Sequence, residues 1–261
     1  MIFDAHAHVY AETIAERAVA SIRDFYDLPL RCDGTPSTLL SIGNEYGVSK
    51  FLIHSVAMTP RQIRHIDEFI AHCVDSHPDR FVGFGTVHPD SNTLVDDIDY
   101  AISLGLRGVK IHPDMQKFAL DEPRALRMFE MLEEKQVPVF IHTGDKRFPF
   151  SNPSRMANVM HRFPKLTAIC AHLGGWSEWD EAAECLTGTG VYVDTSSSMY
   201  ALKPSRMVEI IRAFGVDHVL YGSDYPMWNP GHEAMRLRTL PLTESEMAKI
   251  LYLNAKTLFN L

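Results

Sequence analysis

The sequence of 261 residues predicts an α/β protein folded as one closed (β/α)8 barrel. Two observations lead to this prediction. Short apolar runs recur along the chain, mostly at intervals of roughly 25–30 residues, which is the length of one strand–helix unit in such a barrel. The segments between these runs carry the start and stop signals of helices. Because the alternation continues without a linker or a low-complexity stretch, we expect a single domain over residues 1–261.

Eight of these apolar runs are predicted to be strands. They are continuously apolar instead of alternating, as is typical of parallel strands that helices cover on the outside. Eight strand–helix units favour a closed barrel over a doubly wound open sheet. The predicted strands are Ile2–His6, Phe51–His54, Phe81–Val87, Gly108–His112, Val137–His142, Thr167–His172, Val191–Thr195 and His218–Ser223.

The helices are predicted from their ends. Thr59-Pro60 is an N-cap followed by proline at the first helical position. Gly105 and Gly215 stand where helix C-caps belong, directly before a strand. Pro123 follows two acidic residues and begins a helix, and the capping box that starts at Thr243 begins the last one.

One segment departs from the regular spacing. Val9 to Lys50 is longer than a single helix requires and contains a helix-like stretch (Ala11–Tyr26), an irregular stretch (Asp27–Thr35) and a second helix. In a barrel it would lie over the end of the first strand, at the face that carries the chemistry. It is therefore either a lid over that face or an elaboration of the packing.

The composition limits the classes of partner. A net charge of -8 disfavours nucleic acid or an anionic membrane bound through a basic surface. The four cysteines have no C-x-x-C spacing, and neither a signal peptide nor a membrane-spanning run is apparent. We therefore expect a cytoplasmic protein with reduced thiols that acts on a small molecule. A homodimer is left open.

The histidines are distributed unevenly. Of the 13 in the chain, seven fall at or just beyond the predicted carboxyl ends of strands, and the others are expected to be surface or capping residues. These strand ends open on one face of a barrel, where such enzymes do their chemistry. The seven are His6, His8, His54, His88, His112, His142 and His172.

His6 and His8 point to the same side of a strand, so both can bind one metal ion. His142, His172 and Asp224 end three other predicted strands. Each of these residues alone could be a hydrogen-bonded polar group of the core. Their shared position at one rim favours a metal-dependent active site instead. His54 and His88 fit hydrogen bonding within the rim equally well.

Four local sequences resemble the amidohydrolase superfamily of metal-dependent TIM-barrel hydrolases. They are Gly-Val-Lys-Ile-His-Pro at 108–113, Ile-His-Thr-Gly at 141–144, Ala-His-Leu-Gly-Gly at 171–175 and Tyr-Gly-Ser-Asp-Tyr-Pro at 221–226. Their phrasing is similar to the branch called amidohydrolase 2, which includes aminocarboxymuconate semialdehyde decarboxylase. The resemblance covers essentially the whole chain.

The resemblance implies roles for individual residues. His6, His8, His142 and Asp224 would be the metal ligands, and His172 a second-metal ligand or the catalytic histidine. Lys110 stands where two-metal members carry a lysine carboxylated by carbon dioxide. The branch favours one ion and the ligand set permits two, and Zn²⁺ is the ion that we expect.

Hydrolysis is the main expectation for the reaction. Asp224 would hold a metal-activated water and take its proton, and the hydroxide would attack an amide, lactone or ester carbonyl. The metal or a protonated His172 would stabilise the oxyanion.

The alternative is metal-dependent, non-oxidative decarboxylation of a small hydroxyaromatic or unsaturated acid, with His172 or Asp224 protonating the carbon that loses carbon dioxide. A metal-binding barrel without catalysis is disfavoured, because it would leave the acid–base groups of the rim unexplained.

Substrate contacts are expected from the loops that follow the strands. Arg147 could bind a substrate carboxylate, and Trp176 could wall the pocket together with the rim residue His112. The competing interpretations are a solvent-exposed charge for Arg147 and core packing for Trp176.

Overall fold

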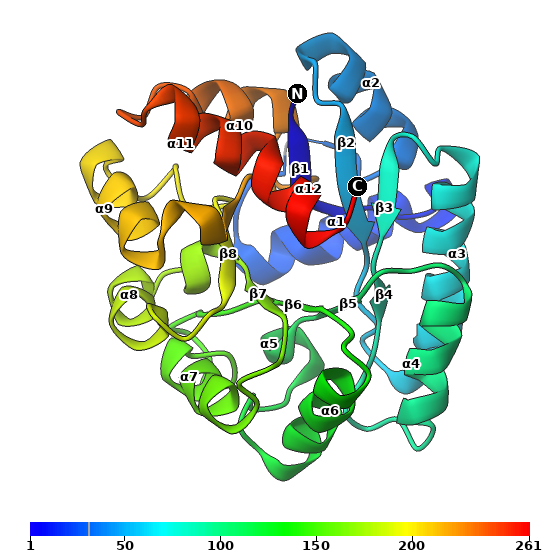
Figure 1. The fold of residues 1–261 in the computed structure, drawn as a ribbon. Helices are drawn as coiled ribbons and strands as arrows, with labels where there is room; N and C mark the ends of the chain where they lie inside the picture. The colour runs from blue at the N-terminus through cyan, green and yellow to red at the C-terminus, as the bar shows by residue number, and fades with distance from the viewer. Residues whose placement is uncertain (31) are drawn as a thin grey trace.

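The computed structural model describes residues 1–30 and 32–261. Strands and helices alternate along the chain, as Figure 1 shows. The strands are β1 (Phe3–His8), β2 (Lys50–His54), β3 (Phe81–Gly83), β4 (Gly85–Thr86), β5 (Val109–Ile111), β6 (Val139–Ile141), β7 (Ala168–Cys170), β8 (Tyr192–Asp194) and β9 (Val219–Leu220).

The helices surround the strands. They are α1 (Glu12–Tyr26), α2 (Pro36–Tyr46), α3 (Ile63–Ser76), α4 (Leu94–Ser103), α5 (Pro113–Gln116), α6 (Pro123–Glu134), α7 (Pro153–Arg162), α8 (Trp179–Leu186), α9 (Pro204–Phe214), α10 (Pro230–Leu237), α11 (Glu244–Ala248) and α12 (Asn254–Leu258). Short 3-10 turns are η1 (Pro60–Gln62), η2 (His172–Gly174) and η3 (Val216–His218), and η4 (Lys249–Leu253) is a π-helical turn.

All strand pairs are parallel, in the orders β1-β2-β3 and β4-β5-β6-β7-β8-β9. The predicted strand Phe81–Val87 is divided, because the chain changes neighbours at Phe84. The Phe84 N–H donates to Ile53 O (3.0 Å) and the Gly85 N–H to Gly108 O (2.9 Å). The prediction of one continuous third strand is therefore wrong, although the segment lies where a barrel requires it.

The two sheets together form a barrel, although no regular strand pairing links β3 to β4 or β9 to β1. Between β9 and β1, backbone hydrogen bonds span the gap instead: the Ala5 N–H donates to Tyr221 O (2.8 Å) and the His8 N–H to Tyr225 O (2.7 Å). The predicted (β/α)8 architecture is confirmed. Between β9 and β1 the barrel is joined by single backbone hydrogen bonds instead of a regular strand ladder.

One end of the barrel is closed by apolar side chains. Phe3, Phe84 and Phe140 are fully buried there, and Phe259 after α12 stacks on Phe3 with ring centroids 5.6 Å apart. In Figure 1, α12 lies in front of the strands and α1 lies behind them. The polar strand ends therefore collect at the end that α12 leaves free.

The predicted helix ends agree with the structure at most positions. Thr59 caps η1, which leads into α3, and the capping box at Thr243 is present. Gly105 and Gly215 have φ of 81° and 85°, which suits glycine before a strand. The last helix differs from the prediction, because the π-helical turn η4 separates α11 from α12.

Asp67 on α3 is a fully buried carboxyl group away from the rim. Its Oδ1 accepts the Thr86 N–H (2.8 Å), while Oδ2 has no hydrogen-bond partner in the part of the chain that the structure describes. Burial raises the pKa of Asp67 to about 7. The folded state therefore favours the neutral acid, and this stabilisation is complete below the unfolded pKa of about 4 and is lost as the pH rises through about 7.

We expect Asp67→Asn to remove this pH dependence. Relative to the variant, the wild-type protein should lose a free energy of unfolding on the order of a few kcal/mol between about pH 4 and pH 7. Urea unfolding of both proteins across this range measures the difference. Asp75→Asn, at an exposed position of the same helix, is the control. Parallel curves for wild type and Asp67→Asn would contradict the assignment.

No helix in the described part of the chain is long and apolar enough to cross a membrane.

Candidate metal centre

Three side chains from the two ends of the chain converge at the rim. His6 Nε2 lies 3.2 Å from His8 Nε2 and 3.3 Å from Asp224 Oδ1, and His8 Nε2 lies 3.7 Å from the same oxygen. Two ligand atoms at tetrahedral positions around a zinc-type ion are separated by about 3.3 Å. The observed separations thus suit three ligands of one divalent ion. His6 and His8 can both be ligands because they are two residues apart on β1 and point to the same side of the strand.

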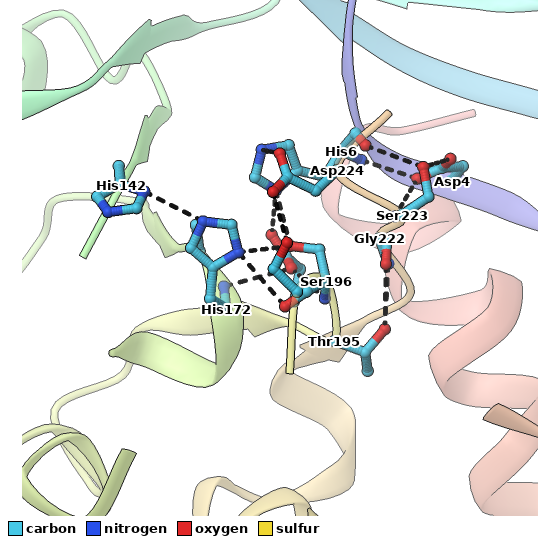
Figure 2. Close-up of polar contacts among 12 residues, drawn as sticks. Asp4, His6, His142, His172, Thr195, Ser196, Gly222, Ser223 and Asp224 are labelled. Atoms are coloured by element: carbon cyan, nitrogen blue, oxygen red, sulfur yellow. Dashed lines mark hydrogen bonds and ion pairs between the residues drawn. The ribbon is translucent and has the colours of Figure 1, made fainter. Parts of the chain in front are cut away.

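His6 is held by a second layer of polar groups. Its Nδ1 lies 2.8 Å from Asp194 Oδ2. The same nitrogen lies 3.0 Å from Ser196 Oγ (Figure 2). A carboxylate in this place keeps the proton on Nδ1 and leaves the Nε2 lone pair for a metal. The sequence did not identify Asp194 as a site residue. The signal that could have found it is an acidic residue at the end of the apolar run of β8.

Asp4 links β1 to the segment that carries Asp224. Its Oδ1 accepts the N–H groups of His6 (3.1 Å) and Ser223 (2.9 Å), and its Oδ2 accepts Ser223 Oγ–H (2.5 Å). A Cβ at Gly222 would lie 2.9 Å from His6 Cβ and 3.0 Å from Asp194 Cγ, so glycine is required there. These contacts place Asp224 beside the two histidines.

His142 lies farther along the rim than predicted. Its Nδ1 is 3.1 Å from His172 Nε2, and its ring stacks on His112 with centroids 4.0 Å apart. Within residues 1–30 and 32–261, the buried His142 Nε2 has no hydrogen-bond partner, and it lies 3.7 Å from Asp114 Oδ2. That it completes the ligand set of His6, His8 and Asp224 stays a prediction.

Other groupings of the rim residues are also compatible with a divalent ion. Ligand atoms lie within 4.8 Å of one another in three groups: His6, His8 and His54; His6, His172 and Asp194; and His112, Asp114 and His142. The sequence left the role of His54 open, and both of its buried ring nitrogens lack hydrogen-bond partners among the residues that the structure describes. His88 instead accepts the Asp90 N–H (3.2 Å) at the edge of the rim.

The protonation states suit metal binding. Burial lowers the pKa values of His6, His8 and His142 well below the ordinary range, so these imidazoles are neutral. Burial also lowers the pKa of His172 to about 4 and raises the pKa of Asp224 to about 7.

Lys110 adds a cation to the rim. Its side chain is 1% exposed, and its Nζ has no hydrogen-bond partner among the described residues and lies 4.1 Å from the centroid of the Phe140 ring. Burial lowers its pKa to about 8. A buried ammonium group needs an anion close by. An anionic ligand bound in the neighbouring cavity would provide that charge.

A cavity of about 340 Å³ opens at this rim and is lined by His6, His8, Lys110, His112, His142 and His172. Helix α1 covers it, and Tyr26 at the end of α1 places its hydroxyl 2.7 Å from His112 Nε2. Of the two interpretations of the segment Val9–Lys50, the lid fits this position. Arg31 of that segment lies outside the described residues.

Arg147 does not have the predicted role in this structure. Its guanidinium donates from Nε (2.9 Å) and Nη2 (2.7 Å) to Asp145 and from Nη1 to Phe25 O (2.8 Å). It also lies 5.3 Å from the Trp176 ring, and Trp176 packs against Tyr26 at 5.2 Å. Both residues hold the end of α1 and are absent from the cavity lining, whereas His112 lines it as expected.

We expect Asp194→Asn to weaken metal binding by about 10- to 100-fold, because the amide no longer fixes the tautomer of His6 as the carboxylate does. Competition with a chelating indicator measures the metal affinity. Asp96→Asn, at an exposed position of α4, is the control. An unchanged affinity in Asp194→Asn would show that this carboxylate does not support a metal ligand.

Known proteins resemble this chain in sequence. A family model described as "Amidohydrolase" matches residues 3–261. A 2-amino-3-carboxymuconate-6-semialdehyde decarboxylase of Dictyostelium discoideum is 27% identical over 134 residues, which are 43% of this chain and 37% of that protein.

Solved structures share the fold. A 5-carboxyvanillate decarboxylase of Sphingomonas paucimobilis has a TM-score of 0.76 at 19% identity, with 100% of this chain and 99% of that chain covered. A dihydroxybenzoic acid decarboxylase of Polaromonas sp. JS666, solved with bound manganese, has a TM-score of 0.77 at 16% identity, with 100% and 97% covered.

The curated relative and both of these structures are decarboxylases. The expectation that the chain hydrolyses an amide, lactone or ester is therefore wrong, and the alternative drawn from the same residues fits better.

Proposed function

Because this chain belongs to the amidohydrolase family, whose model spans residues 3–261, we propose that it is a metal-dependent, non-oxidative decarboxylase of a small hydroxyaromatic or unsaturated carboxylic acid. The observation that carries the proposal is the convergence of His6, His8 and Asp224 at a rim whose cavity is also lined by the buried ammonium group of Lys110. The decarboxylase activity of the curated relative supports it.

The proposed reaction breaks one carbon–carbon bond and returns its electron pair to the carbon that loses carbon dioxide. One proton must reach that carbon, so the carboxylate and one proton become the shortened product and carbon dioxide. A bound divalent ion would fix the substrate carboxylate and a neighbouring hydroxyl and draw electron density from them.

The side chains divide the remaining work. Asp224 is the proposed proton donor, because it stands beside His6 and His8 and its Oδ2 is oriented by the Ser197 hydroxyl (2.6 Å). Lys110 would pair with an anionic oxygen of the substrate. His172 is held by the Ser196 hydroxyl (2.9 Å) and keeps His142 in place, which favours a positioning role.

We propose one ion and an unmodified Lys110. Two imidazole nitrogens and a carboxylate oxygen suit Zn²⁺, whereas the Polaromonas relative holds manganese. Metal content per chain and reconstitution of the metal-free protein with either ion discriminate between them. An intact mass raised by one carbon dioxide, together with two ions per chain, would overturn this part of the proposal.

The reaction itself is tested with the metal-loaded protein and three probes: 2,6-dihydroxybenzoate, 5-carboxyvanillate and the lactone 2-pyrone-4,6-dicarboxylate. We expect carbon dioxide from at least one of the two aromatic acids and no opening of the lactone. Opening of the lactone without carbon dioxide from either acid would contradict the proposal.

A further inference from the structure

We propose that the substrate carries an apolar substituent remote from its reacting carboxylate, and that this substituent lies between α1 and the start of α3. The inference rests on the proposed function for the position of the carboxylate. The part of the cavity concerned, called the apolar arm below, is lined by Ile14, Ala18, Ile22, Met58, Ile66 and Phe69.

Helix α1 supplies one wall of the apolar arm. Ile14, Ala18 and Ile22 are four residues apart and therefore form one stripe along the helix. The next position of the stripe is Tyr26, whose hydroxyl contacts His112 at the rim. At 1.5 Å per residue, the stripe from Ile14 to Tyr26 is about 18 Å long. The wall thus extends well beyond the space that a carboxylate and its neighbouring hydroxyl need.

The opposite wall comes from the segment that follows β2. Ile66 and Phe69 are three residues apart on the first turns of α3, and Met58 precedes η1. Ile14 and Met58, on facing walls, are 41% and 40% exposed although both line the cavity. Large apolar side chains left uncovered at the mouth of a cavity favour an apolar occupant.

Polar residues of this part of the cavity lie at its outer edge. Arg17, Ser21, Gln62 and His65 line the cavity and are exposed. In contrast, the lining residues at the inner end are almost fully buried, with the exception of His8; they are Lys110, His6, His112, His142 and His172. The cavity is therefore divided into a polar inner end for the acid and an apolar middle. Its volume of about 340 Å³ is in the range of pockets that enclose a whole small ligand.

Binding of product analogues tests the apolar arm without requiring turnover. The probes are resorcinol and 5-butylresorcinol, titrated into the metal-loaded protein by calorimetry. Each buried methylene strengthens binding by about fourfold, and ordering the chain removes part of this gain. We expect the butyl compound to bind about tenfold more tightly. Equal or weaker binding of the butyl compound would overturn the inference.

Ala18→Phe places a ring in the middle of the apolar arm and should reduce the tenfold preference to about onefold. Ala20→Phe, on the same helix but outside the cavity lining, should keep it. Thermal unfolding of both variants confirms that they are folded. If Ala18→Phe kept the full preference, the butyl group would bind elsewhere and the inference would fail.

The same comparison in turnover separates this inference from the proposed function. With 2,6-dihydroxybenzoate and its 4-butyl derivative, carbon dioxide release from both and a higher kcat/KM for the butyl acid support both proposals. Release of carbon dioxide from both acids without a higher kcat/KM for the butyl acid would contradict the apolar arm alone. Failure of both acids and of 5-carboxyvanillate to react, with the resorcinol preference intact, would contradict the decarboxylase proposal and leave the apolar arm supported.

Discussion

Asp224→Asn is expected to lower kcat for decarboxylation by about 100- to 10,000-fold, the range usually associated with loss of a general acid. The amide can still accept the Ser197 hydroxyl, which now bonds Oδ2 at 2.6 Å, so the local backbone should stay in place. It cannot deliver a proton to carbon. Carbon dioxide release from the reactive aromatic acid measures kcat, and metal content measured on the same sample separates proton delivery from loss of the ion.

A variant that retains its metal and more than a tenth of the wild-type kcat would remove Asp224 from the role of proton donor. In that case His172, the other candidate that the sequence offered for proton donor, would have to take the role. The corresponding His172→Gln variant would then have to show the loss that Asp224→Asn did not.

Lys110→Met is expected to lower kcat/KM by about 100-fold while raising the thermal stability. Lys110 is 1% exposed and its Nζ has no hydrogen-bond partner among the described residues, so the folded protein bears the cost of a buried cation that no carboxylate directly contacts. Methionine fills a similar volume without charge. Residues that destabilise a fold in this way are typical of binding sites, where the ligand supplies the missing partner.

Thermal unfolding and steady-state kinetics of Lys110→Met are measured beside Lys256→Met, an exposed lysine of α12. The control should change neither quantity. A drop in stability of Lys110→Met with unchanged kcat/KM would show that the ammonium group is structural, paired in solution by a partner other than the substrate.

Much of the fold is predictable because its determinants are local. The apolar runs mark the strands, and Thr59, Gly105 and the capping box at Thr243 mark helix ends through contacts within a few residues. The division of the third strand at Phe84 was not predictable, since it depends on which neighbouring strand each N–H meets. The same holds for the π-helical turn η4.

The features of the site also differ in whether local sequence determines them. The spacing of His6 and His8 already placed two nitrogens on one face, and the structure brings Asp224 to them. The position of His142 next to His172 depends on the width and tilt of the barrel, which no local pattern encodes. Arg147 looked like an anion-binding residue, but Asp145, two residues away, takes up its donors.

Asp194 illustrates what a single sequence conceals. Its contact with His6 Nδ1 at 2.8 Å joins residues 188 apart, and an acidic residue at a strand end has no motif of its own. The sequence likewise left open whether α1 covers the cavity. The contact that holds it there, between Tyr26 and His112, joins residues far apart in the sequence.

The central claim is that His6, His8 and Asp224 hold one divalent ion on which decarboxylation depends. The most direct test removes the metal with a chelator and titrates the ion back while carbon dioxide release and bound metal are measured together, in the wild-type protein and in His6→Ala. We predict activity that rises linearly to one ion per chain in the wild type, with neither activity nor tight binding in His6→Ala. Full carbon dioxide release by the metal-free protein, or one tightly bound ion in His6→Ala, would contradict the claim.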